Sequence, residues 1–321
     1  MALSFIRVAV SLILIIVLLY VMRGNYSQIL NVLKGTRVAV FTMAFLLFIL
    51  ALSTASIRLK LIVEAQDIVI TFREAISLTF IGYFFNNFLP TAIGGDLVKG
   101  YYLSKKSANN TGSYTSVFVD RAMGLVTMVF MAFVALVLAG GAIVDASIRN
   151  TIYTITAVSV LGILLLLNKA IAKRLSGLLF MFKPIRETVK KVYDIVHGYK
   201  NRAGLMAGTF LISVVSQLTY FFCIGVLVAS IGSYISTMNV LMRMPIVSMM
   251  SLLPSINGLG VREGSTIVLF GPLIGRENAF AISILMIFML LLTSLIGGLI
   301  YTLSPQFKIK VKDIVKEEGA I

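Results

Sequence analysis

The sequence predicts an all-α, polytopic membrane protein with six full spans, two re-entrant broken hairpins and inverted-topology repeats. The 321-residue chain is 59% hydrophobic and has a mean hydropathy of +0.99, which makes it far more apolar than an ordinary soluble domain. A similar sequence motif occurs twice inside apolar stretches, as LPTAIGGDLVKG at 89–100 and as LPSINGLGVREG at 253–264. Irregular backbone at membrane depth is tolerated only where protein or a water-filled cavity satisfies its polar groups. The repeated motif therefore predicts a binding cavity between two halves of the chain.

Apolar stretches of about 18 residues or more are long enough to cross a bilayer. The sequence contains six such stretches, at 5–22, 37–57, 117–139, 151–168, 203–230 and 279–301. The first is expected to be a retained anchor, because Arg23-Gly24-Asn25 offers no small-residue cleavage site. The single cysteine, Cys223, excludes an intramolecular disulfide.

The net charge of +15 indicates orientation in a membrane rather than nucleic-acid binding. Basic residues concentrate in cytoplasmic loops, and residues 169–202 carry nine Lys or Arg against two acidic residues. We expect a basic cytoplasmic loop here, whose middle either lies along an anionic leaflet or is a solvated linker. The tail at 302–321 carries four lysines and is expected to be cytoplasmic. The sequence thus predicts a plasma-membrane protein with both termini in the cytoplasm.

Counting the crossings from a cytoplasmic N-terminus predicts two hairpins. Residues 58–73 and the loop with Lys99, Lys105 and Lys106 both fall on the inner side, so 74–98 must enter and leave from the cytoplasm, broken near Pro90. By the same count, 238–275 enters and returns from outside, broken near Pro254.

Two inverted repeats follow from this count, at 1–139 and 140–301. A rival topology, in which each hairpin makes one or two full spans, stays open.

Charged residues in or beside apolar segments are expected to pair and to face a cavity, since a charge at the bilayer centre costs about 2.5–3.5 kcal/mol. These residues are Asp96, Lys99, Asp120, Arg121, Arg243, Arg262 and Glu263. If a helix starts at Gly94-Gly95, Asp96 and Lys99 have the spacing of an ion pair. The alternative is that Asp96 only caps that helix.

Two arginines are candidate phosphate ligands. Asp120 and Arg121 are expected in the first turns of a long helix, where the dipole favours an acid. Arg121 either snorkels to the interface or offers a planar, permanently charged fork to a phosphate. Arg262 is the matching candidate in the second half. Its neighbour Glu263 is either its salt-bridge partner or a proton-carrying group.

Backbone N–H groups at two predicted helix starts add to this positive pocket, because such groups bind anions. The residues at these starts are Gly94 and Gly95 in the first half and Asn257, Gly258 and Gly260 in the second. Asn86 and Asn87 either donate hydrogen bonds to an anionic head group or satisfy carbonyls freed around Pro90.

Three strings, NNFLPTAIGGDLVKG, VFVDRAMGL and LPSINGLGVRE, resemble the flippase-like transmembrane region of lysylphosphatidylglycerol synthases. The resemblance covers about 5–301 and implies the same membrane fold. The positions that it singles out are Asn87, Pro90, Gly94, Gly95, Asp96, Lys99, Arg121, Gly258, Gly260, Arg262 and Glu263. Lys99 stands where the family often has Arg, and Ser255-Ile256-Asn257 is less rich in Pro and Gly. The 20 or so residues after Pro305 cannot hold the soluble aminoacyl-transferase domain, so lysyl transfer by this chain alone is not expected.

We therefore expect a non-enzymatic membrane transporter that moves an anionic lipid between leaflets, either a phospholipid or a polyprenyl-phosphate carrier. One alternative is an ion-coupled carrier of a small anion. The other is a non-transporting membrane partner of a glycosyl- or aminoacyl-transferase. No metal or cofactor pattern occurs in the sequence. The expected partners are an anionic lipid and the bilayer, with a separate transferase or a second copy of the chain as further candidates, and no nucleic acid.

Overall fold

The computed structural model describes most of the chain as helices. The described residues are 13, 16–18, 20, 22–88, 94–107, 109–140, 145–167, 198–199, 202–253, 255 and 258–307. Within them every regular element is helical and no strand occurs, so the all-α prediction is confirmed. Several predicted features lie outside the described residues. These are most of 5–22, Pro90, Pro254, Asn257, most of 169–202, and the tail from 308 onward.

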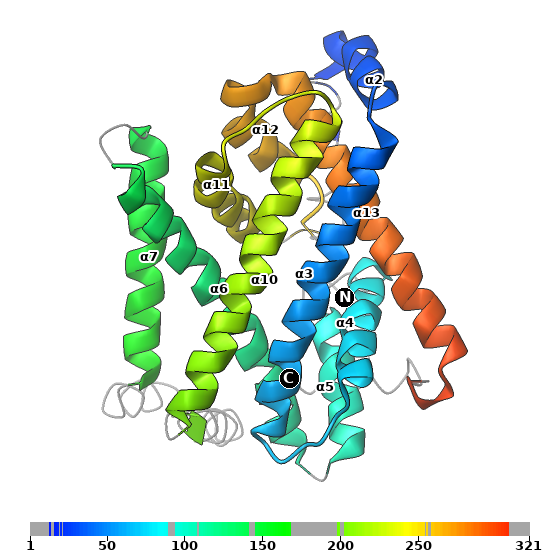
Figure 1. Ribbon diagram of the computed structural model, residues 1–321, viewed down its shortest axis with the longest axis vertical. Coiled ribbons are helices and arrows are strands. Elements are labelled where there is room, and N and C mark those ends of the chain that lie inside the picture. The colour runs from blue at the N-terminus through cyan, green and yellow to red at the C-terminus, as the bar shows by residue number, and fades with distance from the viewer. Residues whose placement is uncertain are drawn as a thin grey trace.

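Four helices are long and apolar enough to cross a membrane: α3 (Val38–Glu64), α6 (Asn110–Leu138), α10 (Ala203–Ser230) and α13 (Arg276–Leu303). They correspond to the predicted spans at 37–57, 117–139, 203–230 and 279–301. Figure 1 shows α3 and α10 side by side along their length, with α6 and α13 on either side of them.

Two of these four helices, α3 and α6, extend well beyond the predicted boundaries. Helix α3 continues to Glu64, because Arg58 finds a buried partner and Lys60 pairs with Glu64 one turn on. Helix α6 begins at Asn110 rather than at 117, because the Asn109 side chain accepts a 2.8 Å hydrogen bond from the Gly112 N–H and caps it.

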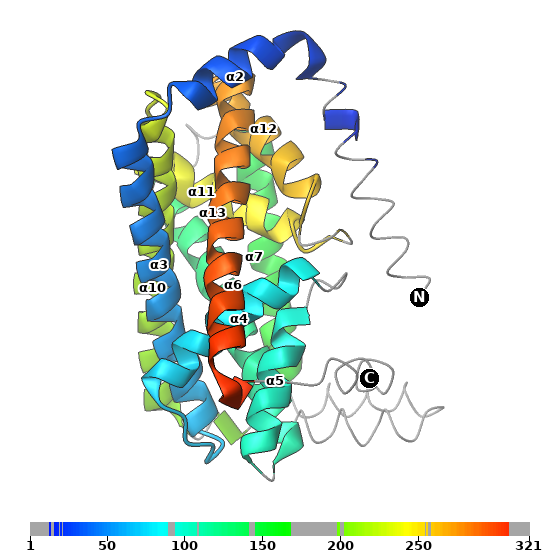
Figure 2. The same ribbon diagram turned by 90° about the vertical axis from the view of Figure 1, so that its right-hand side faces the viewer.

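A fifth predicted span, 151–168, coincides with helix α7 (Ala146–Leu167). This helix starts earlier than predicted, where the Asp145 carboxylate accepts a 2.8 Å hydrogen bond from the Ser147 N–H. Three short elements complete the ends of the fold: η1 (Arg23–Asn25), α2 (Tyr26–Lys34) and η2 (Pro305–Phe307). Helix α2 lies across one end of the molecule, over the start of α13 (Figure 2), where Asn25 donates a hydrogen bond to Glu277.

The two broken segments form two short helix pairs at opposite ends of the molecule. The pair α4 (Phe72–Phe88) and α5 (Gly94–Lys106) occupies the lower end, and the pair α11 (Thr237–Met250) and α12 (Val261–Ile274) the upper end (Figures 1 and 2). Their broken ends approach each other at mid-height (Figure 2). The prediction that Lys99 lies in a loop was wrong, because α5 continues to Lys106 and includes Lys99.

Close backbone crossings hold α4 in the centre of the fold. A Cβ atom on Gly95 would lie 2.1 Å from the carbonyl oxygen of Gly82, and one on Gly297 would lie 2.0 Å from that of Phe80. Helix α4 therefore touches α5 on one side and α13 on the other at distances that only glycine allows.

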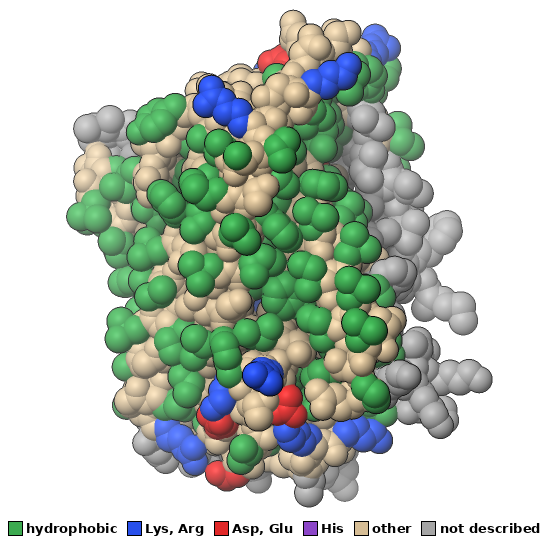
Figure 3. All heavy atoms as spheres, turned by 45° about the vertical axis from the view of Figure 1, so that its right-hand side comes forward, with side chains coloured by type: hydrophobic (Ala, Val, Ile, Leu, Met, Phe, Trp, Pro, Cys, Tyr) green, Lys and Arg blue, Asp and Glu red, His purple; other side chains and the backbone are tan. Residues whose placement is uncertain are grey.

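The outer surface matches that of a membrane protein. Hydrophobic side chains cover the middle of the face shown in Figure 3, while Lys, Arg, Asp and Glu side chains gather mainly at its lower end, with a few at the top. Exposed leucines recur along the spans, among them Leu46 and Leu50 on α3 and Leu295 and Leu299 on α13. Such a continuous apolar band is typical of a surface that faces lipid.

Candidate functional site

A central cavity of about 410 Å³ lies among the spans and the broken ends of both helix pairs. Residues that line it include Leu52 of α3, Met128 of α6, Gln217 of α10 and Met286 of α13. Each of these lies near the middle of its helix, which places the cavity near the middle of the spans.

Six of the predicted site residues line this cavity: Asn86, Asp96, Lys99, Asp120, Arg121 and Arg262. Arg58, which the sequence analysis had placed in an inner loop, lines it as well. Much of the remaining lining is apolar and includes Phe48, Leu52, Ile224, Met286 and Met289. The cavity therefore offers several charged side chains and an apolar surface to the same ligand.

Asp96 lies in the first turn of α5 and pairs with two cations. Its Oδ1 atom lies 3.4 Å from the Lys99 ammonium, one turn further on, and its Oδ2 atom pairs with Nη1 of Arg121 on α6. The predicted pair of Asp96 and Lys99 is thus confirmed. Two cations share one carboxylate here, so the cluster carries a local positive excess.

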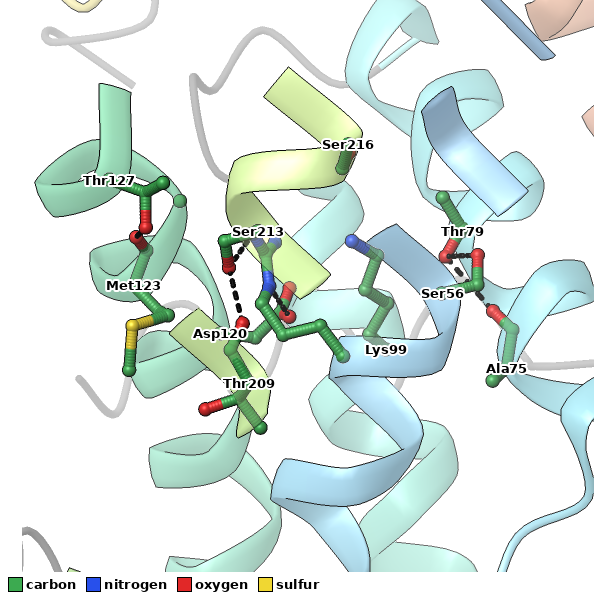
Figure 4. A network of polar contacts seen from close by, with 12 residues as sticks. Ser56, Ala75, Thr79, Lys99, Asp120, Met123, Thr127, Thr209, Ser213 and Ser216 are labelled. Carbon is green, nitrogen blue, oxygen red and sulfur yellow. Dashed lines mark hydrogen bonds and ion pairs between the residues drawn. The ribbon is translucent and has the colours of Figure 1, made fainter. Parts of the chain in front are cut away.

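Asp120 pairs with Arg58 across the α3–α6 contact. Nε of Arg58 donates a 2.7 Å hydrogen bond to Oδ1 of Asp120, and Nη1 donates one of 3.2 Å to the Ser213 hydroxyl on α10. Figure 4 shows Asp120 and Ser213 at this contact, with Lys99 extending toward the same region. The expectation that Asp120 stands in the first turns of its helix was wrong, because α6 begins at Asn110. The helix dipole acts within the first turn, so it does not stabilise the Asp120 carboxylate at this position.

The sequence does contain a signal that Arg58 lies inside a membrane helix and needs a charged partner. The apolar stretch that begins at 37 continues through Leu59, Leu61, Ile62 and Val63, so Arg58 interrupts a helix rather than following one. A charge inside an apolar helix calls for a partner, and the partner is the buried Asp120, 62 residues away in the sequence.

Arg262 and Glu263 form a pair at the start of α12. Nε and Nη2 of Arg262 lie 3.1 and 3.0 Å from Oε1 of Glu263, and both residues are buried. The salt-bridge alternative for Glu263 is therefore confirmed. Its other carboxylate oxygen accepts a hydrogen bond from the Gly260 N–H, which caps α12.

Two of the backbone N–H groups expected to bind an anion, those of Gly95 and Gly260, have protein acceptors. The Gly95 N–H donates a 2.7 Å hydrogen bond to Oδ1 of Asn86, so this asparagine caps the start of α5. Gly258 and Gly260 have φ angles of +77° and +84°, which fit a tight turn before α12. Glycines 94, 95, 258 and 260, together with Asn87 and Glu263, are not among the lining residues.

Other chemistry is not evident in the described part of the chain. No group of three or more His, Cys, Asp or Glu side chains in it has the arrangement of a metal site. Arg243, a further charged residue of interest, lies within α11 and does not line the central cavity.

Comparison with known proteins places the chain in a family. A family model described as the lysylphosphatidylglycerol synthase TM region matches residues 4–298. The chain belongs to this family. A UPF0104 membrane protein of Pyrococcus horikoshii is 24% identical over 92% of this chain and 96% of its own length. No solved structure matches the chain. The resemblance found in the three sequence strings is thus confirmed, and the protein is a multi-helix membrane protein of the synthase transmembrane-region family.

Proposed function

We propose that this member of the synthase transmembrane-region family moves an anionic lipid between the two leaflets, without enzymatic activity of its own. The observation that carries the proposal is the lining of the central cavity. Four cations, Arg58, Lys99, Arg121 and Arg262, face it together with two carboxylates, beside a mainly apolar remainder. A lipid phosphate is attracted by the cations, while the first methylene groups of its tails contact the apolar surface.

The size of the cavity fits a head group. A volume of about 410 Å³ lies within the roughly 300–1,000 Å³ of small-molecule sites. We place the phosphate near Arg121 and Lys99 and leave the acyl or prenyl tails in the bilayer. Arg262 contributes from the second half of the chain, because its guanidinium uses only one edge, Nε and Nη2, for Glu263.

We also propose inverted-topology repeats at 1–139 and 140–301, with both termini of the chain in the cytoplasm and the protein in the plasma membrane. The α4–α5 pair returns to the end where α3 finishes, and the α11–α12 pair to the end where α10 finishes (Figure 1). This arrangement supports two re-entrant hairpins entering from opposite sides. Small movements of either hairpin would then open the same site to one leaflet or the other.

A translocation assay in liposomes tests the function. Fluorescent phosphatidylglycerol and phosphatidylcholine are compared in vesicles with the wild-type protein, with a Lys99→Gln/Arg121→Gln double variant, and with Lys105→Gln. Lys105 is an exposed cation on the same helix as Lys99 and serves as the matched control. We expect faster movement of the anionic lipid with wild type and Lys105→Gln and loss of that movement in the double variant.

Unchanged movement in the double variant would exclude this cavity as the phosphate site. Uptake of inorganic phosphate into the same vesicles, with no lipid movement, would favour the carrier of a small anion instead.

A further inference from the structure

The three clusters of opposite charge at the central cavity differ in how well they are shielded. Side-chain exposure is 9% for Arg58 and 11% for Asp120, and 10% for Arg262 and 5% for Glu263. In the third cluster it is 23% for Asp96 and 32% for Arg121, with 14% for Lys99. Ions that keep partial access to a cavity exchange partners at a lower cost than buried ones.

The two buried pairs are fixed parts of the fold. Asp120 holds Arg58, which Ser213 also contacts, and Glu263 binds Arg262 through two nitrogens while capping α12. Removing either carboxylate would leave a buried cation without its counter-ion, which is strongly unfavourable. Both carboxylates therefore stay paired with their cations when a ligand binds.

Asp96 differs in both geometry and charge balance. It is shared between Arg121 and Lys99, and the contact with Lys99 is long, at 3.4 Å. At its own helix start, Asn86 accepts the hydrogen bond from the Gly95 N–H, and both carboxylate oxygens of Asp96 face cations. The Asp96 carboxylate thus occupies the place between two cavity-facing cations that a phosphate oxyanion would take.

We propose that Asp96 is an exchangeable internal counter-anion that determines the specificity of the phosphate site. It neutralises Arg121 and Lys99 in the empty cavity and is displaced when a phosphate oxyanion binds them. The inference rests on the proposed function and deepens it. A phosphate offers more acceptor oxygens than a carboxylate and bridges a guanidinium fork and an ammonium at once. A lipid without net negative charge gains less and leaves the pair of Asp96 and Arg121 in place.

The exchange also accounts for release. A site that held only Arg121 and Lys99 would bind an anionic head group tightly and let it go slowly. The return of Asp96 to these cations offsets the loss of the phosphate contacts. Removing the carboxylate should therefore tighten phosphate binding and slow translocation. Damage to the fold would also slow translocation, but it would weaken phosphate binding.

The Asp96→Asn variant tests this inference. Binding of short-chain phosphatidylglycerol to the purified full chain in detergent is measured for wild type, Asp96→Asn and Glu64→Gln. The last makes the same change in net charge at a surface pair with Lys60, outside the cavity. We expect about fivefold tighter binding for Asp96→Asn together with slower lipid movement in liposomes, and near-wild-type behaviour for Glu64→Gln.

The possible outcomes separate this inference from the proposed function. Tighter binding by Asp96→Asn supports the exchange even if wild type binds too weakly to detect. Wild-type binding with unchanged or weaker binding by a correctly folded Asp96→Asn overturns the exchange alone. No phosphatidylglycerol binding by either protein overturns both ideas. Inorganic phosphate is tested in parallel to identify the source of the oxyanion. Binding of phosphatidylglycerol without binding of inorganic phosphate supports the exchange with a lipid, and binding of inorganic phosphate alone, tighter in Asp96→Asn, supports the exchange with a soluble anion and overturns the lipid function.

Discussion

Arg58 donates a 2.7 Å hydrogen bond to Asp120, which joins α3 to α6 beside the central cavity. Both side chains are shielded, so each charge depends on the other. Replacing one partner leaves an uncompensated buried charge, which costs about 3–5 kcal/mol. We expect Asp120→Asn to lower the melting temperature in detergent far more than Asp96→Asn. An Arg58→Met/Asp120→Leu double variant should recover much of the loss. Two single effects that simply add would show that the pair is not coupled.

The contact between Gly95 and Gly82 predicts a steric limit on the first hairpin. Gly95→Ala brings a Cβ atom to about 2.1 Å from the Gly82 carbonyl oxygen, so α4 and α5 must separate, at a cost of about 1–3 kcal/mol. Gly208→Ala on α10 is the matched control, because nothing lies within 4 Å of its added atom. That variant should be neutral or stabilised by up to about 1 kcal/mol. Equal melting temperatures for the two variants would contradict the tight crossing.

Glu74 predicts a pH dependence at the lower end of the molecule. Burial alone would raise the pKa of Glu74, but hydrogen bonds from Lys106 and Thr71 outweigh it and lower the pKa from 4.5 to about 2. Because the pKa is depressed in the folded state, the stabilisation is present above about pH 4.5 and is lost as the pH falls toward 2.

Melting temperatures measured from pH 6 to pH 3 check this prediction. The difference between wild type and Glu74→Gln should shrink as the solution becomes acidic. Glu64→Gln, which removes a carboxylate from a pair on one helix, controls for net charge. A difference from wild type that stays constant over this range would show that Glu74 makes no such contribution.

The proposed topology predicts labelling from opposite sides. In a Cys223→Ser background, Arg73→Cys tests the start of α4 and Tyr234→Cys the segment between α10 and α11, both at exposed positions. Serine can keep the hydrogen bond that Cys223 makes to the Ala44 carbonyl oxygen. We expect an impermeant maleimide, added to intact cells, to label only Tyr234→Cys, and lysis to expose both. Labelling of both cysteines before lysis would reject the inverted arrangement.

Local spacing explains which parts of the site could be predicted. Asp96 and Lys99 are three residues apart and follow Gly94-Gly95. A helix that starts at these glycines is enough to bring the two side chains into contact. Arg262 and Glu263 are neighbours in the chain, so their salt bridge could be predicted as an alternative to a proton-carrying role for Glu263. By contrast, the position of Asp120 within its helix was misjudged, because the polar residues from Thr111 to Ser116 hid the start of α6 from a reading based on hydropathy.

Apolar length and Gly/Pro breaks are local properties of the chain, so they were enough to predict that it is helical, that it belongs in a membrane, where most of its long helices lie and which two motifs interrupt them. The pairing of charges, in contrast, follows from the packing of the helices. Arg58 reaches Asp120 and Ser213, and Asn86 caps α5. These contacts depend on how helices distant in sequence pack, which hydropathy and spacing do not encode.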